Sequence, residues 1–139
     1  MIGFDGTAAI KALEGLSASM KERCITRIAT RVGKDVFRRA FELLSGARTD
    51  PPGSYPVPVR TGNLRRYLWA LFPGESTGGI KGKYDVGPGM AYVGDSADYA
   101  DAIHSSRPFL TDAADEVLGR AALIGDEVVA EEVRAYGLE

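Results

Sequence analysis

The chain has 139 residues and a formal net charge of −2, with 45% hydrophobic and 26% charged side chains, as in an ordinary globular domain. Its one cysteine, Cys24, excludes an internal disulfide and fits a reducing compartment. Residues 67–72 form the longest strongly apolar stretch, which is too short to cross a bilayer, and the N-terminal residues lack the pattern of a secretory signal. We therefore expect a single domain over residues 1–139, with no membrane contact and a core large enough to fold without disulfides or metal.

The charge is unevenly distributed along the chain. Residues 1–47 carry a net charge of +3, residues 48–109 a net charge of +1, and residues 110–139 a net charge of −6. Such a polarity can steer one copy of a protein onto the next copy. Solvated faces on separate helices would give the same distribution, so the sequence leaves both interpretations open.

Two helices are expected in the first third of the chain. Residues 5–16 carry apolar side chains at roughly helical spacing, which predicts a short helix. A long amphipathic helix then follows, with an N-cap at Ser17 or Ser19, and Gly33 weakens it locally. The apolar positions of this long helix lie three or four residues apart, at Met20, Cys24, Ile28, Val32, Val36, Phe37, Ala40, Phe41 and Leu44.

A loop and a small sheet are predicted in the middle of the chain. Gly46 is the expected stop of the long helix, and the Pro-rich residues 46–60 exclude both helix and central strand. Loops of this length are usually either functional or disordered, and the sequence leaves both interpretations open. Thr61 then caps a short helical turn. Antiparallel strands are predicted at residues 67–72, 83–86 and 90–94, with a Gly-rich hairpin arm at residues 74–82.

The last third of the chain is predicted to be helical. Residues 98–104 form a short helical or irregular crossover, and Pro108 opens a final helix that reaches about Tyr136. Gly119 and Gly125 weaken this helix and can bend it. Its buried stripe consists of Leu110, Ala114, Val117, Ala121, Ile124 and Val128. The fold class is therefore α+β, with a long N-terminal amphipathic helix, a Pro-rich loop, a small antiparallel sheet and a C-terminal helix.

The residue inventory offers little for catalysis or metal binding. His104 is the only histidine, and Cys24 lies on the apolar face of the long helix, where a small core residue is the simplest interpretation. A Cys–His pair remains open, since residues far apart in sequence can meet in the fold. Zinc needs more Cys or His ligands, and Asp95, Asp98 and Asp101 lack the glycine and glutamate of a calcium loop. We predict no enzyme activity, no cofactor and no metal site.

The basic side chains are more informative. A stripe at helical spacing follows the long helix and consists of Arg27, Arg31, Lys34 and Arg38. A second patch around the Thr61 turn consists of Arg60, Arg65 and Arg66. The stripe could face nucleic acid or an acidic partner, or it could be a solvated helix face. Aromatic residues are not interleaved with it, so base stacking is not expected.

Three short blocks occur in a characteristic order. They are Pro58-Val59-Arg60-Thr61-Gly62-Asn63-Leu64-Arg65, then Tyr92-Val93-Gly94 with Tyr99-Ala100, and then Arg107-Pro108-Phe109-Leu110. Together with the long basic helix before them, these blocks resemble the tail-completion, or head–tail joining, family of tailed phages and related prophages. The resemblance extends from about residue 7 to residue 130. The chain departs from the family pattern at residues 101–106, where an acidic residue and a Gly-Thr pair often occur.

The resemblance implies a structural virion protein that assembles in the host cytoplasm as a ring at the neck of the particle, with six copies expected. The ring would link the tail tube to the head connector, with DNA passing through it. Residues 49–60 and 74–82 would become ordered on docking, and the basic helix of one copy would meet the acidic C-terminal helix of the next. The candidate contact residues are Arg27, Arg31, Lys34, Arg38, Arg60, Thr61, Gly62, Leu64, Arg65, Arg66, Arg107 and Phe109.

Three other functions remain as alternatives. A tail terminator and a head-closure protein of the same neck are also small α+β ring subunits, although the long first helix favours tail completion. A nucleic-acid-binding protein would use the basic stripe, but the sequence pI of about 5.5 argues against this as the main role.

Overall fold

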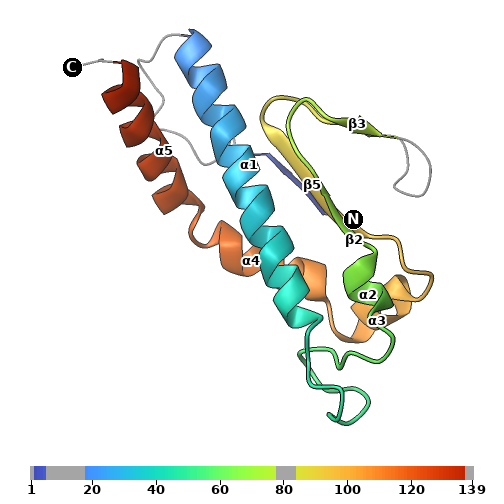
Figure 1. Cartoon of the computed structure of the whole chain (residues 1–139). Coiled ribbons are helices and arrows are strands. Elements are labelled where there is room, and N and C mark those ends of the chain that lie inside the picture. The colour runs from blue at the N-terminus through green and yellow to red at the C-terminus, as the bar shows by residue number, and fades with distance from the viewer. Residues whose placement is uncertain (1, 6–17, 78–83, 137–139) are drawn as a thin grey trace.

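The computed structural model describes residues 2–5, 18–77 and 84–136. A long helix, α1 (Ala18–Leu43), occupies the centre and packs against a small antiparallel sheet and against the C-terminal helices α4 (Phe109–Leu118) and α5 (Ala121–Tyr136) (Figure 1). The prediction of a mixed α and β fold with a long N-terminal helix, a small antiparallel sheet and a C-terminal helical region is confirmed. None of the helices in the described part of the chain is long and apolar enough to span a membrane.

Helix α1 forms because its apolar side chains recur on one face. Most of the predicted positions are buried, while Phe41 lies at the edge of this face and is exposed. Gly33 has a packing role, since a Cβ atom there would lie 3.0 Å from Cβ of Ala91 and 3.1 Å from Cε1 of Phe72. The glycine therefore lets α1 approach the sheet closely, which offsets its low helix propensity.

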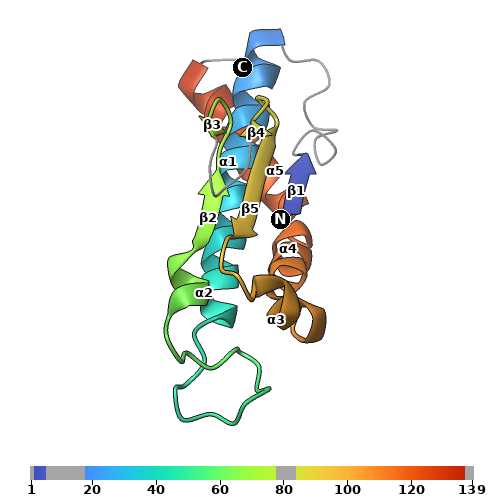
Figure 2. The ribbon, with the colours of Figure 1, turned by 90° about the vertical axis from the view of Figure 1, so that its right-hand side faces the viewer.

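The main sheet has three antiparallel strands in the order β1 (Ile2–Asp5), β5 (Met90–Asp95), β2 (Leu68–Leu71) (Figure 2). A separate ladder joins β3 (Ser76–Thr77) to β4 (Tyr84–Asp85). On the main sheet, the ring of Trp69 lies against Gly94, where an added Cβ would be 2.4 Å from the indole. Central strand β5 thus has a glycine where an aromatic ring of the neighbouring strand needs the space.

Strand β1 corrects the expected helix over residues 5–16 at its first residue only. Asp5 belongs to β1, which pairs with β5 in the register Ile2↔Val93, and the other residues of the expected helix lie outside the described part of the chain. The sequence pattern missed this strand because its pairing partner is about ninety positions away. Of the expected arm at residues 74–82, the described portion contains β3, which is paired with β4.

The segment between α1 and α2 (Asn63–Arg66) folds back onto the end of α1. Val57 N–H donates to the carbonyl of Leu43 at 2.8 Å, and Gly46 N–H donates to the carbonyl of Val57 at 2.9 Å. A Cβ on Gly46 would lie 2.4 Å from the carbonyl oxygen of Pro56, so this glycine allows the two chain segments to touch.

The cap of α2 is one residue later than predicted. Gly62, with φ of +79°, occupies the N-cap position that the sequence assigned to Thr61. A positive φ favours glycine over threonine at this turn. The Thr61 hydroxyl still accepts a hydrogen bond from Asn63 N–H at 3.3 Å, so it supports the turn from outside the helix.

The C-terminal region contains α3 (Ala100–Ser106) and two further helices, where a single final helix was predicted. The break lies at Gly119 and Arg120, between α4 and α5 (Figure 1). Gly119, with its weak helix propensity, lies at this interruption, which lets α5 follow the N-terminal half of α1. The predicted buried stripe is confirmed at Leu110, Ala114, Val117, Ala121, Ile124 and Val128.

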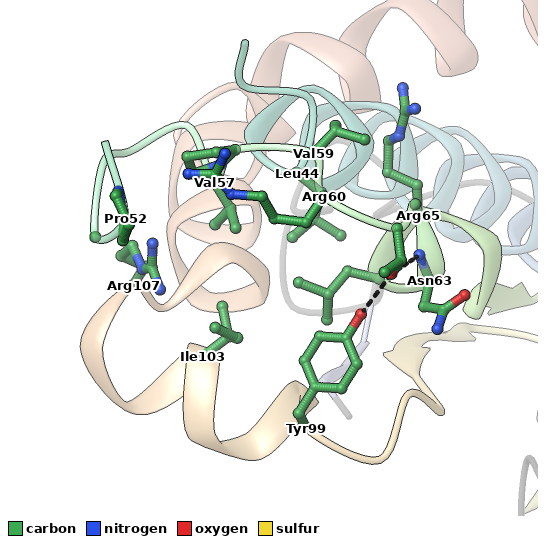
Figure 3. Close-up of a pocket in the computed structure, with 15 residues that line it drawn as sticks. Leu44, Pro52, Val57, Val59, Arg60, Asn63, Arg65, Tyr99, Ile103 and Arg107 are labelled. Carbon is green, nitrogen blue, oxygen red and sulfur yellow. Dashed lines mark hydrogen bonds between the residues drawn. The ribbon is translucent and has the colours of Figure 1, made fainter. Parts of the chain in front are cut away.

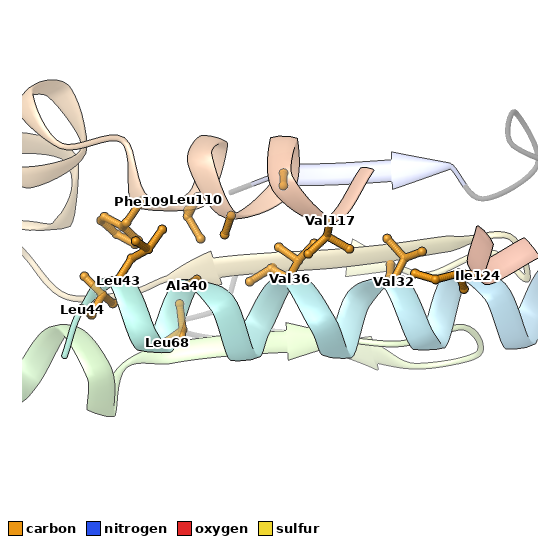
Figure 4. Packing of buried hydrophobic residues seen from close by; sticks show 14 of the residues in the cluster. Val32, Val36, Ala40, Leu43, Leu44, Leu68, Phe109, Leu110, Val117 and Ile124 are labelled. Carbon is orange, nitrogen blue, oxygen red and sulfur yellow. The ribbon is translucent and has the colours of Figure 1, made fainter. Parts of the chain in front are cut away.

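The core joins these layers along the length of α1. Phe109 of α4, with 0% exposure, packs beside Leu43 and Leu44 at one end, and Ile124 of α5 lies beside Val32 farther along (Figure 4). Leu68 of β2 closes the same cluster from the sheet side. This continuous core fixes the C-terminal end of α1 relative to α2, α3 and α4.

Candidate partner-binding site

A pocket of about 180 Å³ lies at the C-terminal end of α1, between the Pro-rich loop, α2 and α3. Tyr99, the N-cap residue of α3, and Ile103 of α3 form one wall, and Val59 and Arg60 of the loop lie opposite them (Figure 3). The aliphatic lining also includes Leu44, from the segment just after α1. The result is an apolar pocket with polar and basic side chains around it.

The three sequence blocks behind the family resemblance meet at this pocket. Residues 58–65 of the first block line it, the second block contributes Tyr99, and the third contributes Arg107. The Thr61 hydroxyl and the Tyr99 hydroxyl are 3.3 Å apart and share a hydrogen bond, which links the first two blocks directly (Figure 3). The Tyr92-Val93-Gly94 part of the second block lies in β5, among the residues of the sheet.

Hydrogen bonds to backbone carbonyls hold the Pro-rich loop in place. The Arg60 guanidinium donates to the carbonyls of Arg48 and Asp50, the latter at 2.7 Å. The Arg107 guanidinium donates to the carbonyl of Ser54 at 3.1 Å. These contacts fix the loop over the end of α1, within one chain.

A tyrosine joins the same loop to α4. The Tyr55 hydroxyl donates to the carboxylate of Asp112 at 2.8 Å. Burial and this hydrogen bond together raise the pKa of the Tyr55 hydroxyl above its ordinary value. The hydroxyl therefore stays protonated and remains a hydrogen-bond donor to Asp112 throughout the physiological pH range.

The arginines at this end of the molecule contact groups other than carboxylates in the described part of the chain. Arg60 and Arg107 donate to neutral carbonyls, and Arg65 stacks on Phe41 with 5.3 Å from its guanidinium carbon to the ring centroid. Arg66 is exposed and donates to the amide oxygen of Asn63 at 3.1 Å. Among the described residues, no carboxylate forms an ion pair with any of these four, and none lines the pocket.

The basic stripe on α1 behaves differently. Arg27 pairs with Glu131 and, at 3.0 Å, with Glu132, and Arg31 pairs with Glu127 at 2.7 Å. The stripe thus meets the acidic C-terminal helix of its own chain, where the sequence interpretation had placed that contact between copies. Arg27 and Arg31 are therefore less able to attract another molecule, because carboxylates of the same chain already offset their charges.

The rest of the stripe is divided between two environments. The Lys34 ammonium lies 6.0 Å from the centroid of the Phe72 ring, beside the sheet. Arg38 pairs with Asp35 one turn away at 3.2 Å, and its side chain is 66% exposed. The four residues therefore do not form one continuous positive surface.

Two buried members of the predicted contact set belong to the hydrophobic core. Phe109 is fully buried and cannot contact a partner directly, whereas Leu64 is 8% exposed and lines the pocket wall. The edge of the Phe109 ring packs against His104, with 5.3 Å between ring centroids. These two residues position the pocket walls from within.

Several charged residues that join the helices were not singled out from the sequence. Glu132 is 4% exposed and accepts hydrogen bonds from Arg23, at 3.3 Å, and from Arg27. Arg39 binds Glu116 through two nitrogens, at 2.5 and 3.2 Å. The opposite net charges of the N-terminal and C-terminal segments could have indicated that α1 and α5 attract each other. Net charges do not show whether such pairs form within one chain or between two copies.

The structure separates the cysteine from the histidine. Cys24 is fully buried near the start of α1, and burial, followed by the nearby charge of Glu132, raises the pKa of its thiol. His104 packs on Phe109, which lies beside Leu43 near the other end of α1 (Figure 4). Along the helix, Cys24 and Leu43 are roughly 28 Å apart at 1.5 Å per residue. Cys24 and His104 form no catalytic pair here. In the described ranges, no cluster of three or more His, Cys, Asp or Glu could hold a metal ion.

No family model, curated protein or solved structure matches the chain. The family resemblance therefore rests on the order of the three sequence blocks.

Proposed function

We propose that this protein is a structural component of a tailed-phage virion that acts at the head–tail junction as one copy in a ring, with six copies expected. The ring would link the tail tube to the head connector. The observation that carries the proposal is the meeting of the three sequence blocks around one pocket at one end of α1. A shared contact surface gives a reason for these separated blocks to occur together.

The composition of this end of the molecule supports a role in protein contacts. Three aromatic side chains are exposed here: Phe41 of α1, Tyr67 just after α2, and Tyr99 just before α3. Arg65 stacks on Phe41, and Arg66 directly precedes Tyr67 in the chain. Aromatic residues and arginine are enriched in protein interfaces and in their energetic hot spots. This end of the molecule, and no longer the α1 stripe, is therefore the proposed contact surface.

The alternatives are weighed by the same contacts. A tail terminator or a head-closure protein of the same neck would use the same surface, so the pocket does not discriminate among these three positions. Nucleic-acid binding through α1 is disfavoured because Arg27 and Arg31 are paired with α5. DNA passage through a ring requires no such binding.

Electron microscopy of assembled particles tests the proposal. The labelled protein should give ring density at the neck, between the head connector and the tail tube. A chain that stays monomeric and never associates with connector or tail proteins would contradict it. Size measurement in the presence of those proteins gives the same answer without imaging.

A pair of variants tests the contact surface itself. Arg66 and Arg38 are both exposed and each binds a side chain three residues earlier, so Arg66→Glu and Arg38→Glu make the same change at two places. We expect Arg66→Glu to abolish incorporation into particles and Arg38→Glu to leave it intact. Circular dichroism should show that both variants are folded. Equal incorporation of the two variants would contradict the proposed surface.

A further inference from the structure

We infer that the pocket at the end of α1 binds an acidic, extended segment of a different protein, in which a carboxylate neighbours an aliphatic side chain. The inference rests on the proposed function only for the source of this segment, which would be a neighbouring neck protein. The chemistry of the segment follows from the pocket itself.

The size and lining of the pocket suit a side chain. Its volume of about 180 Å³ is smaller than the roughly 300–1,000 Å³ of typical small-molecule sites, so a cofactor-sized ligand does not fit. The walls carry Val57, Val59, Leu64 and Ile103, which offer an aliphatic environment. An aliphatic side chain of a partner would bury apolar surface there, which favours association.

The charge around the pocket selects a carboxylate. Arg60 and Arg107 satisfy part of their hydrogen-bonding capacity with backbone carbonyls, but a carbonyl does not neutralise a guanidinium. The lining contains Arg65 as a third arginine and, among the described residues, no aspartate or glutamate. Guanidinium groups match carboxylates in charge and in planar geometry, so an acidic residue beside the aliphatic side chain would complete the site.

The same observations favour a peptide over a nucleic acid. Affinity for a nucleic-acid backbone comes from several cations that contact successive phosphates. The stripe that could continue such a track along α1 is paired with α5 through Arg27 and Arg31. A pocket lined by aliphatic side chains and three arginines fits a short peptide segment better.

The acidic helix of a second copy is a poor source for this segment. Glu127, Glu131 and Glu132 already pair with α1 of their own chain, and Glu116 pairs with Arg39. Docking them in the pocket of another copy would break these internal pairs. A different protein with an unpaired acidic segment avoids that cost.

The test uses the full chain labelled with ¹⁵N and a blocked five-residue peptide of alternating glutamate and leucine. The amide signals of residues 99 and 103 and the Nε–Hε signals of Arg60 and Arg107 should shift on titration. The matched peptide with glutamine in place of glutamate should bind about tenfold more weakly, a difference of about 1.4 kcal/mol. Binding of the acidic peptide should also weaken as salt is added. Equal binding of the two peptides, or shifts that map elsewhere, would overturn the inference.

Three variants locate the binding. Arg107→Gln should weaken binding of the acidic peptide about tenfold, while Arg38→Gln, which removes the same charge from an exposed site on α1, should change it less than about twofold. Because Arg107 also holds the loop, Ile103→Glu provides a second test that spares every arginine. It places a negative charge in the pocket wall and should abolish binding of the acidic peptide. Equal effects of Arg107→Gln and Arg38→Gln, or full binding by Ile103→Glu, would overturn the inference.

Two further titrations decide between occupants. Concentration-dependent shifts of the same pocket signals in the chain alone would identify a second copy as the occupant and overturn the inference. If a short DNA duplex shifts the same signals and binds more tightly than the acidic peptide, nucleic acid is the occupant and the inference is overturned. Peptide binding does not depend on where the protein lies in a particle. If the peptide does not bind but the protein is found at the neck, only this inference is overturned. If the peptide binds but the protein is absent from the neck, only the proposed function is overturned.

Discussion

The N-terminal half of α1 and the pocket beyond its C-terminal end use arginine in different ways. Along the helix, Arg27 and Arg31 pair with carboxylates of α5, so these charges offset one another within the chain. At the pocket, Arg60 and Arg107 donate to backbone carbonyls, and no carboxylate of the described residues offsets their charge. An arginine that binds a carbonyl can order its own loop and still attract an acidic partner, whereas an arginine paired with a carboxylate can do only the first.

The largest expected effect tests whether the pocket end depends on the core. Phe109→Ala removes the largest fully buried side chain, next to the residues that end α1. We expect the free energy of unfolding to fall by about 4 kcal/mol, because the lost burial and the cavity both destabilise the fold. Denaturant titration measures it. Leu118→Ala, on the exposed side of α4, should cost less than about 1 kcal/mol. Similar losses for the two variants would contradict this view of the core.

The next effect tests the paired face of α1. Glu132→Gln keeps the shape of the side chain but removes the charge that Arg23 and Arg27 share at a nearly buried position. Removing one partner leaves the guanidinium groups incompletely paired, so we expect a loss of about 2 kcal/mol in the free energy of unfolding. Thermal or denaturant unfolding at neutral pH would measure it. A variant as stable as the parent would show that this pairing holds nothing together.

A pH effect is expected in the segment that leads from β5 to the pocket wall. Burial raises the pKa of the Asp95 carboxyl to about 6, although the hydrogen bond from Ala97 N–H opposes this shift. Its ordinary pKa is 3.8, so between about pH 4 and pH 6 the folded chain holds a proton that the unfolded chain has lost. Stability should therefore fall as the pH rises through this window, and the loss should remain above it.

Asp95→Asn tests that expectation. The variant should be about 1 kcal/mol more stable than the parent at pH 7, after allowance for solvent screening of a partly exposed group. Its unfolding free energy should change less between pH 4 and pH 6. Asp98→Asn, at an exposed position nearby, is the matched control and should behave as the parent does. An identical pH profile for Asp95→Asn and the parent would contradict the assignment.

The smallest expected effect separates exposed from buried pairing on the same face. Glu127 and Arg31 form an ion pair with side chains 47% and 38% exposed. We expect Glu127→Gln to lower the free energy of unfolding by less than about 0.5 kcal/mol, since exposed pairs gain little in water. The same unfolding measurement as for Glu132→Gln gives a direct comparison. If the Glu127 variant lost as much stability, exposure would not be what distinguishes the two pairs.

Hydrophobic spacing and turn residues in the sequence predicted α1 and most of the strands. The spacing of Met20, Cys24 and Ile28 located α1, and the strand predicted at residues 90–94 corresponds to β5. Strand β1 was missed because its partner is distant in the chain, and the break at Gly119 was underestimated because a glycine only weakens a helix. Local sequence reports local preference, and tertiary contacts decide the rest.

The candidate site was predictable only in part. The sequence singled out Thr61, Arg65 and Arg107 as contact residues, but it did not show that they line one pocket with Tyr99. It also identified Arg27 as a contact, without showing that the partner is Glu132 of the same chain. Charge and motif order are visible in a sequence, whereas the pairing of segments about a hundred positions apart depends on how α1 and α5 pack.

The packing of Trp69 on Gly94 provides the molecule with an optical reporter. Trp69 is the only tryptophan of the chain, is 8% exposed, and donates from its indole nitrogen to the Ser96 hydroxyl at 2.9 Å. Its fluorescence should shift to longer wavelength when β2 separates from β5 and water reaches the ring. Emission from this indole therefore reports whether β2 and β5 stay paired, while the Nε–Hε signals of Arg60 and Arg107 report on the pocket. A single sample can then show whether the sheet and the pocket lose their structure together.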